Sequence, residues 1–207
     1  MSSLLSEIRA FTEGCHSELE TKFDIFNSIQ DQADYCALLA RLHGLYSRLE
    51  SALEPWSDEF VDLGLDYDKR KKLNLLTNDL RHFGWNSLTS FGDDFSLRIE
   101  TFPQAVGCLY VLEGSTLGGQ VISKHLKSKL QLNEDGTGLS FYQSYGSSTG
   151  QMWRNFCESL SRYSERLTDA NLRQEVLISA KNTFAFVQRF LCPDCAGSSS
   201  QGAAPKI

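Results

Sequence analysis

The sequence contains no apolar run long enough to cross a bilayer, which takes about 18 consecutive apolar residues. Its first residues, MSSLLSEIRAFTEG, lack the basic start and apolar centre of a secretory signal peptide. The net charge of −6 provides no basic excess for contacts with nucleic-acid phosphates. These absences predict a cytoplasmic protein that has neither a membrane nor a nucleic acid as a partner.

β-Strand patterns are scarce, and there are only 4 prolines to interrupt helices. Apolar residues recur instead at the three- and four-residue spacing of a helix face. In the first segment this apolar stripe comprises Ile8, Phe11, Cys15, Leu19 and Phe23. We expect helices over residues 4–23, 34–53, 67–83, 102–130, 149–167 and 171–191. Because no internal repeat is visible, the sequence predicts an all-α, single-domain helical bundle over residues 1–191.

Several boundaries of these helices carry local signals. Asp31 or Asp34 is suited to cap the second helix, and Pro55 prevents its continuation. Thr101 is suited to cap the fourth helix, which follows a loop over residues 85–100. The run NEDGTG after that helix predicts a turn. The final residues, 192–207, are rich in glycine and serine and are expected to be disordered.

The expected helix over residues 102–130 contains more glycine than a helix interior tolerates without cost. Gly107, Gly114, Gly118 and Gly119 together cost roughly 3–4 kcal/mol relative to alanine. The first three fall within about 40° of one another on the helical wheel and form a bare strip. Close packing of another helix explains such a strip, and so does a flat ligand against the backbone. The adjacent pair Gly118 and Gly119 exceeds what packing needs and favours a bend.

The 4 histidines form no HExxH or paired motif, so zinc and di-iron sites have little support. His82 and His125 lie in polar helix ends, where a solvated side chain is expected. His43 lies near an apolar face and is expected to be hydrogen-bonded. His16 differs because Glu20 follows one turn later, where it can orient an imidazole that ligates haem iron. A hydrogen-bonded structural histidine is the alternative.

The 6 cysteines are mostly scattered through helical segments, as buried thiols are in a reducing compartment. Cys192 and Cys195 form a Cys-Pro-x-Cys element in the tail. One such pair supplies two of the four ligands that zinc requires. Regulatory haem binding to a Cys–Pro dipeptide is one alternative, and a tail without a ligand is the other.

The segment around His16 and the glycine-rich segment both resemble parts of one protein family. The run RAFTEGCHSELE around His16 and the run YVLEGSTLGGQ together resemble the biliverdin-producing haem oxygenase family, in its bacterial form. The runs AKNTFAFVQRFL and GLSFYQSYG resemble further segments of that family. The matches run in order from residue 9 to residue 191. The resemblance implies a bundle in which haem is sandwiched between a proximal N-terminal helix and a kinked, glycine-rich distal helix.

The resemblance also implies roles for individual residues. His16 matches the proximal ligand of the haem iron, and Arg9 matches a basic position that pairs with a haem propionate. Tyr110 and Lys181 match positions near the propionates. The residues that match the distal helix, where O2 binds, are Gly114, Ser115, Gly118 and Gly119. Ser115 stands where animal-type members carry an aspartate, and Glu113 is expected to point away from the haem.

The implied activity is oxidative cleavage of haem to biliverdin, Fe2+ and CO, with O2 as co-substrate. Its implied partners are an electron-donating reductase or ferredoxin and a biliverdin-accepting protein, with the enzyme itself a monomer. Haem would be both substrate and cofactor, with iron held axially by His16. The alternatives are a non-catalytic haem carrier or sensor on the same fold, and a protein whose glycine strip serves helix packing alone.

Overall fold

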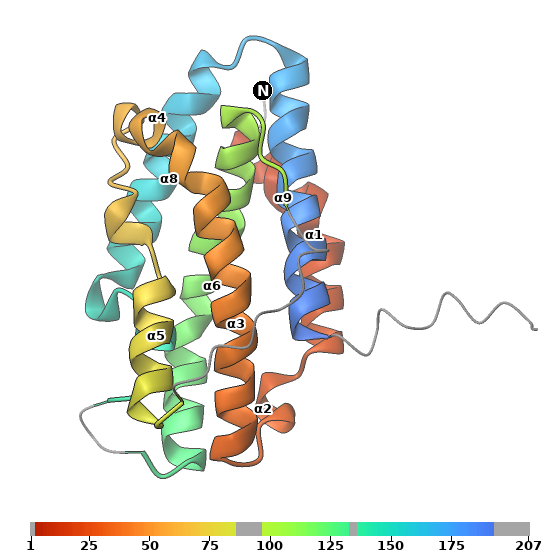
Figure 1. Cartoon of the computed structure of the whole chain (residues 1–207). Helices are drawn as coiled ribbons and strands as arrows, with labels where there is room; N and C mark the ends of the chain where they lie inside the picture. Colours follow the sequence, from red (N-terminus) through yellow and green to blue (C-terminus); the bar gives the residue numbers. More distant parts are fainter. Residues whose placement is uncertain (1–2, 86–96, 133–135, 193–207) are drawn as a thin grey trace, which may run out of the picture.

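The computed structural model describes residues 3–85, 97–132 and 136–192, and Figure 1 shows them as a bundle of helices. Every regular element within these ranges is helical. The α-helices are α1 (Leu4–Lys22), α2 (Ile25–Ser28), α3 (Gln32–Leu53), α4 (Ser57–Asp62), α5 (Leu73–His82), α6 (Phe102–Lys129), α7 (Ser140–Gln143), α8 (Thr149–Arg166) and α9 (Ala170–Leu191). Three 3₁₀ turns join them: η1 (Glu54–Trp56), η2 (Asp68–Arg70) and η3 (Gly146–Ser148). The all-α prediction is confirmed.

The capping residues explain why the long helices begin where they do. Asp31 caps α3 by accepting a hydrogen bond from the Asp34 backbone N–H at 2.9 Å. Thr101 caps α6 through the backbone N–H of Gln104. The helix expected over residues 67–83 is shorter than predicted, because its first part forms η2 and α5 begins only at Leu73. Pro55 ends α3 as expected but lies within η1.

Three short helices were not expected: α2, α4 and α7 have only 4, 6 and 4 residues. Segments of this length contain too few turns to display helical periodicity. Of the tail expected to be disordered, residues 192–207, all but Cys192 lie outside the described residues, as does most of the loop expected over residues 85–100.

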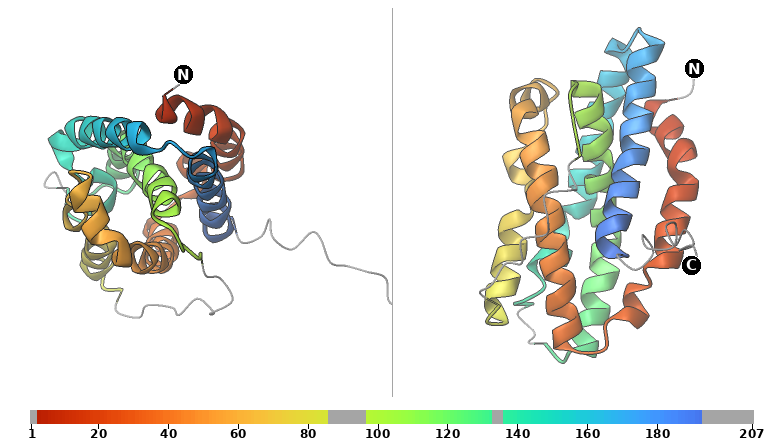
Figure 2. Two further views of the ribbon diagram at one scale, coloured as in Figure 1. Left: turned by 90° about the horizontal axis from the view of Figure 1, so that it is seen from above. Right: turned by 45° about the vertical axis from the view of Figure 1, so that its right-hand side comes forward.

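α6 is the central helix of the bundle and packs against α7, α8 and α9 (Figure 2). It is helical without interruption through Gly118 and Gly119, and the bend expected there stays a prediction. α1 packs against α8 and α9. Only the N-terminal half of α1 is buried, through Leu4, Ile8 and Thr12. In the rest of its apolar stripe, Cys15, Leu19 and Phe23 are partly buried against the core, and Phe11 is exposed.

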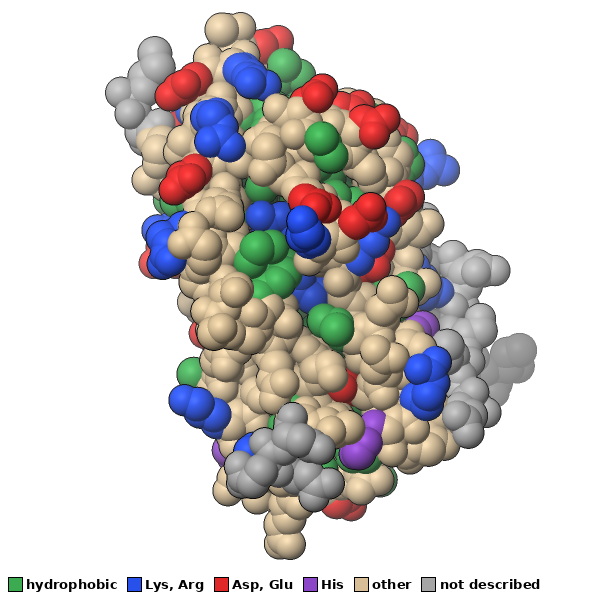
Figure 3. Space-filling model, turned by 90° about the vertical axis from the view of Figure 1, so that its left-hand side faces the viewer, with side chains coloured by type: hydrophobic (Ala, Val, Ile, Leu, Met, Phe, Trp, Pro, Cys, Tyr) green, Lys and Arg blue, Asp and Glu red, His purple; other side chains and the backbone are tan. Residues whose placement is uncertain are grey.

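Acidic and basic side chains are interspersed on the face of the molecule shown in Figure 3. Across the described ranges, no helix combines the length and the apolar character that crossing a bilayer requires.

Candidate functional site

A cavity of about 520 Å³ lies between α1, α3 and α6, with α9 closing one side. Most of its wall is apolar, including Leu19 and Phe23 of α1 and Leu42 of α3. The cavity therefore takes up the last two residues of the α1 apolar stripe, which the bundle buries only in part. Of the eight sequence-predicted site residues, the cavity brings together Arg9, His16, Tyr110, Gly114, Ser115 and Gly119.

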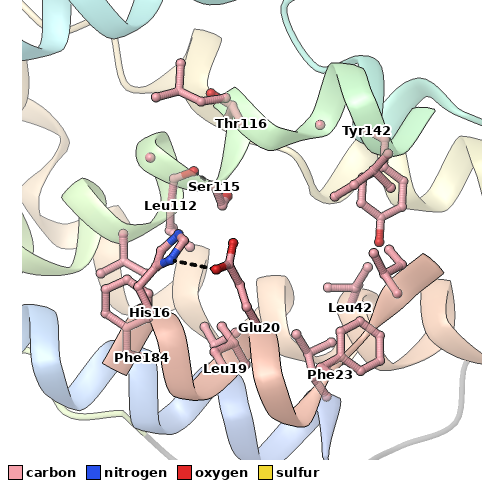
Figure 4. Close-up of a pocket in the computed structure, with 18 of the residues that line it drawn as sticks. His16, Leu19, Glu20, Phe23, Leu42, Leu112, Ser115, Thr116, Tyr142 and Phe184 are labelled. Atoms are coloured by element: carbon pink, nitrogen blue, oxygen red, sulfur yellow. Dashed lines mark hydrogen bonds and ion pairs between the residues drawn. The ribbon is translucent and has the colours of Figure 1, made fainter. Parts of the chain in front are cut away.

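His16 lies on the α1 wall and projects toward α6 (Figure 4). Its Nδ1 is 3.5 Å from Oε2 of Glu20, one helical turn later. The edge of the imidazole also packs near Phe184 of α9, with ring centroids 6.1 Å apart. The His16 side chain is 62% exposed, so protein atoms leave most of it accessible. Its Nδ1 has a carboxylate partner, which leaves Nε2 as the nitrogen available to a ligand in the cavity.

The four glycines of α6 divide into two pairs with different roles. A methyl group at Gly107 would collide with the Val176 carbonyl oxygen of α9, and one at Gly119 would collide with the Tyr142 carbonyl oxygen. Helix packing therefore explains these two. A methyl group at Gly114 would lie 3.9 Å from the Trp153 ring, and one at Gly118 would meet nothing within 4 Å. No protein contact requires glycine at Gly114 or Gly118.

The cavity wall contains only part of the predicted glycine set. Gly114 and Gly119 line the cavity, whereas Gly118 is exposed and lies outside its wall. Gly107 is buried against α9 and does not line the cavity. Gly107, Gly114 and Gly118 therefore do not form one ligand-facing strip, as the helical wheel suggested they could. Gly114 is the glycine that both faces the cavity and lacks a packing reason.

One end of the cavity is cationic. Arg9 of α1 and Tyr110 of α6 both line it. Burial raises the pKa of Tyr110, while the charge of Arg9 and side-chain hydrogen bonds with Thr12 and Arg9 oppose that rise. These interactions place the guanidinium and the phenol together. Lys181 is exposed and lies outside the cavity wall, with its Nζ 5.8 Å from the ring centroid of Phe11.

Two acidic side chains, one near the end of α1 and one just after it, line the cavity farther along the chain. Glu20 and Asp24 both belong to its wall, and both are exposed. The pKa of the Asp24 carboxyl is lowered, chiefly by a hydrogen bond from Asn27. The wall thus carries a basic group before His16 in the chain and acidic groups after it. An anionic group on a bound ligand is favoured at the Arg9 end.

Ser115 faces His16 across the cavity (Figure 4). Its hydroxyl donates to the Leu112 carbonyl oxygen at 2.8 Å. Tyr46 of α3 lines the same cavity, and burial raises the pKa of its phenol while Ser115 opposes that rise. Glu113 points away, as predicted, and is 1% exposed. Its carboxylate pairs with Arg70 behind α6. No carboxylate of α6 therefore reaches the Ser115 side of the cavity among the residues described.

Several cavity residues were not anticipated from the sequence. They are Tyr46, Lys72, Tyr142, Trp153 and Phe184, contributed by α3, the η2–α5 junction, α7, α8 and α9. The sequence signals their apolar or buried character at best. No local sequence pattern indicates that these segments, which are far apart in the chain, form one cavity wall.

The remaining histidines lie outside this wall. His43 is hydrogen-bonded through Nε2 to the Thr77 hydroxyl at 3.2 Å, which confirms the expectation for it. His82 lies in the last turn of α5, as expected. The solvated reading of His125 is wrong: its ring packs edge-on against Phe26 with centroids 4.9 Å apart, and its Nε2 is buried without a hydrogen-bond partner. The Cys192–Cys195 element extends beyond the described residues.

Comparison with known proteins gives consistent matches. The family model described as "Heme oxygenase" matches residues 2–192. A protein named "Heme oxygenase" from Xanthomonas campestris is 29% identical over 156 residues, covering 75% of this chain and 87% of that protein.

Two solved structures support the fold. The NO- and CO-bound haem oxygenase from Neisseria meningitidis has a TM-score of 0.74 and 24% identity, covering 100% of this chain and 98% of that chain. Haem oxygenase-2 from Synechocystis, in complex with haem and NO, has a TM-score of 0.71 and 19% identity, covering 92% of this chain and 84% of that chain. With the family model spanning nearly the whole sequence, the chain belongs to the haem oxygenase family.

Proposed function

We propose that the cavity between α1 and α6 is a haem site and that the chain cleaves haem oxidatively to biliverdin, Fe2+ and CO, using O2 and external electrons. Family membership supports the reaction. The single observation that carries the site is the position of His16 opposite the bare backbone of Gly114, in one largely apolar cavity. The helical domain responsible is proposed to span residues 1–191, with residues 192–207 as a tail.

The cavity residues fit the chemistry of haem. A porphyrin needs flat apolar walls, one axial donor and a basic group for its carboxylates. The walls are supplied by side chains such as Leu19 and Phe184, the donor by His16, and the basic group by Arg9. A side chain at Gly114 would project into the cavity without meeting a protein atom closer than 3.9 Å. Glycine at this position therefore keeps free a space that the protein itself does not fill.

His16 is proposed to hold the haem iron through Nε2, because its Nδ1 faces the Glu20 carboxylate at 3.5 Å. Glu20 then fixes the tautomer and the ring orientation, and it increases the basicity of the imidazole. When bound, haem supplies the redox chemistry of O2 at its iron, and a neutral imidazole does not promote O–O cleavage as a thiolate would.

The α6 side is proposed to accommodate O2. Gly114 presents backbone without a side chain, and Ser115 adds a hydroxyl that is held by the Leu112 carbonyl oxygen. Gly119 permits the close approach of α7 that positions this segment. Gly118 is proposed as part of the distal helix on the basis of its match to the family alone, since it lies outside the cavity wall.

The Arg9 end is proposed to receive the haem propionates. Arg9 and Tyr110 are joined there, whereas Glu20 and Asp24 make the other part of the wall unfavourable for carboxylates. Lys181 is proposed as a further propionate partner from its family match. Its position beside Phe11 supports a contact at the outer edge at most.

The remaining proposals concern the partners of the enzyme, its location and its oligomeric state. The electrons are proposed to come from a reductase or a ferredoxin, and the product to pass to a biliverdin-accepting protein. The enzyme is proposed to act in the cytoplasm as a monomer.

A haem carrier or sensor is the second candidate, and Ser115 favours it, because no distal carboxylate is present on α6 to organise water for O2 chemistry. One experiment separates the two functions. Purified protein is loaded with haemin and treated with ascorbate or a reductase in air. Turnover predicts that the Soret band declines while biliverdin absorption grows, and a stable Soret band would favour the carrier.

A further inference from the structure

The end of the cavity away from Arg9 is closed by residues of the short helix α7. Arg9 and Phe23 are each seven residues from His16, so they lie about 10 Å from it along the chain direction of α1, on opposite sides. Tyr142 of α7 lines the cavity beyond His16, near Phe23 and Leu42 (Figure 4). α7 therefore contributes the wall opposite the basic end.

α7 is fixed in place although it has only 4 residues. The buried Asp79 carboxylate of α5 caps it by accepting hydrogen bonds from the backbone N–H groups of Ser140 and Phe141, both at 2.8 Å. The Tyr142 carbonyl oxygen packs against Gly119 of α6, so closely that a methyl group on that glycine would collide with it. Contacts with both α5 and α6 therefore determine where the Tyr142 side chain lies.

The Tyr142 hydroxyl makes no hydrogen bond with any residue that the structure describes. Its side chain is 8% exposed and lines the cavity, and the hydroxyl is directed toward Leu42 of α3 (Figure 4). Burial is the main cause that raises the pKa of this phenol, so it keeps its proton and remains a donor. A buried tyrosine hydroxyl usually has a partner. This one is placed to donate to a ligand in the cavity.

Haem itself offers this hydroxyl no acceptor when its propionates lie at the Arg9 end. The two propionates flank one meso carbon, so the opposite meso carbon and its apolar substituents then face α7. Oxidative cleavage at that carbon releases it as CO and leaves a carbonyl oxygen on each of the two pyrrole rings that it joined. Cleavage at this edge therefore creates two hydrogen-bond acceptors beside the wall that carries Tyr142.

We propose that Tyr142 is a product-binding residue, whose hydroxyl donates a hydrogen bond to a terminal carbonyl oxygen of biliverdin opened at the meso carbon opposite the propionates. This inference rests on the proposed function, because it takes biliverdin as the product. The hydrogen bond forms with the product and not with the substrate. Tyr142 therefore slows the release of biliverdin without changing the affinity for haem, and it favours the isomer that is opened at the α7 end.

The test is a titration of biliverdin into the haem-free protein, which does not depend on turnover. The biliverdin isomers are produced by chemical oxidation of haem, separated and titrated one at a time. Tyr142→Phe should bind the isomer opened opposite the propionates about fivefold more weakly, which corresponds to the loss of one hydrogen bond. Dissociation of this isomer, followed by stopped-flow absorbance, should be faster by the same factor. The affinities for haemin and for the isomer opened between the propionates should not change.

Tyr35→Phe is the matched control. The Tyr35 ring is stacked on that of Tyr142 with centroids 6.4 Å apart, but its hydroxyl donates to the Gly138 carbonyl oxygen at 2.9 Å and the residue does not line the cavity. Tyr35→Phe should lower the Tm and leave the affinities for biliverdin and haemin at their wild-type values. Tyr142→Phe should not lower the Tm of the haem-free protein, because its hydroxyl has no protein partner to lose.

The outcomes separate this inference from the proposed function. If the wild type binds haemin but forms no biliverdin, the enzymatic function fails, and the biliverdin titration still tests Tyr142. If the wild type forms biliverdin and Tyr142→Phe binds every isomer as tightly as the wild type does, only the role of Tyr142 fails. Equal losses for haemin and for all isomers would show that the side chain merely fills space, and they would overturn the proposal. A wild type that does not bind biliverdin would overturn it as well.

Discussion

Gly114→Ala is the substitution whose effects on the empty and the haem-bound protein should have opposite signs. In the haem-free protein the new methyl group has room, because the Trp153 ring lies 3.9 Å away, at ordinary van der Waals distance. Replacing glycine by alanine within a helix contributes about 1 kcal/mol to stability. For a chain of this size, that corresponds to a rise in Tm of roughly 2–4 °C.

With haem in the cavity, the same methyl group would occupy space beside the porphyrin. Overpacking a well-filled site costs typically 1–3 kcal/mol, which corresponds to a roughly 5- to 150-fold loss in affinity or in turnover. Thermal unfolding of the haem-free protein, haemin titration by absorbance and biliverdin formation measure the three quantities.

Gly14→Ala is the matched control. Gly14 lies within α1, is exposed and does not line the cavity, and a methyl group added there would meet nothing within 4 Å. This variant should gain the same stability and keep wild-type haem binding and turnover. If Gly114→Ala is stabilised and still binds and cleaves haem like the wild type, the α6 backbone does not form the distal wall.

Three further predictions concern packing, charge and pH. Gly107→Ala should lower the free energy of unfolding by about 1–3 kcal/mol, because the methyl group meets the Val176 carbonyl; an unchanged Tm would contradict the assignment of Gly107 to packing. Arg9→Ala should weaken haemin binding about fivefold, and Lys181→Ala should weaken it less, because of these two residues only Arg9 lines the cavity. Equal losses of haemin affinity in the two variants would contradict this prediction. Burial is the main cause that lowers the pKa of Lys72 to about 8. The free energy of unfolding of the wild type relative to Lys72→Met should fall as the pH drops from about 10.5 to about 8. In that window the lysine is protonated in the unfolded chain and neutral in the folded chain. If denaturant titrations show the same difference in free energy at every pH, the pKa of Lys72 is not lowered by folding.

The sequence predicts the long helices well because their ends carry local signals. Asp31 and Thr101 cap α3 and α6 through their own side chains, and this geometry depends on a few neighbouring residues. The region between α3 and α5 was less predictable. A 3₁₀ turn at Asp68–Arg70 and the short helix α4 are too brief for periodicity to reveal, and tertiary contacts determine them.

The site was predicted only in part for a similar reason. The helical wheel places Gly107 beside Gly114 because it reports direction around the axis, and it carries no information on what lies at each height along a helix of 28 residues. α9 meets α6 at Gly107, whereas the cavity opens at Gly114. Arg70 and Lys72 meet Glu113, which follows Arg70 by 43 positions in the chain, so no local sequence pattern indicates these contacts.

The role of His16 as the haem ligand is tested most directly by one spectroscopic measurement. Haemin is titrated into the wild type, His16→Ala and His16→Ala with added imidazole, and each sample then receives ascorbate in air. The account predicts a histidine-ligated Soret band and biliverdin formation in the wild type, loss of both in His16→Ala, and recovery of the Soret band with imidazole. An unchanged haem spectrum in His16→Ala without imidazole would contradict the account.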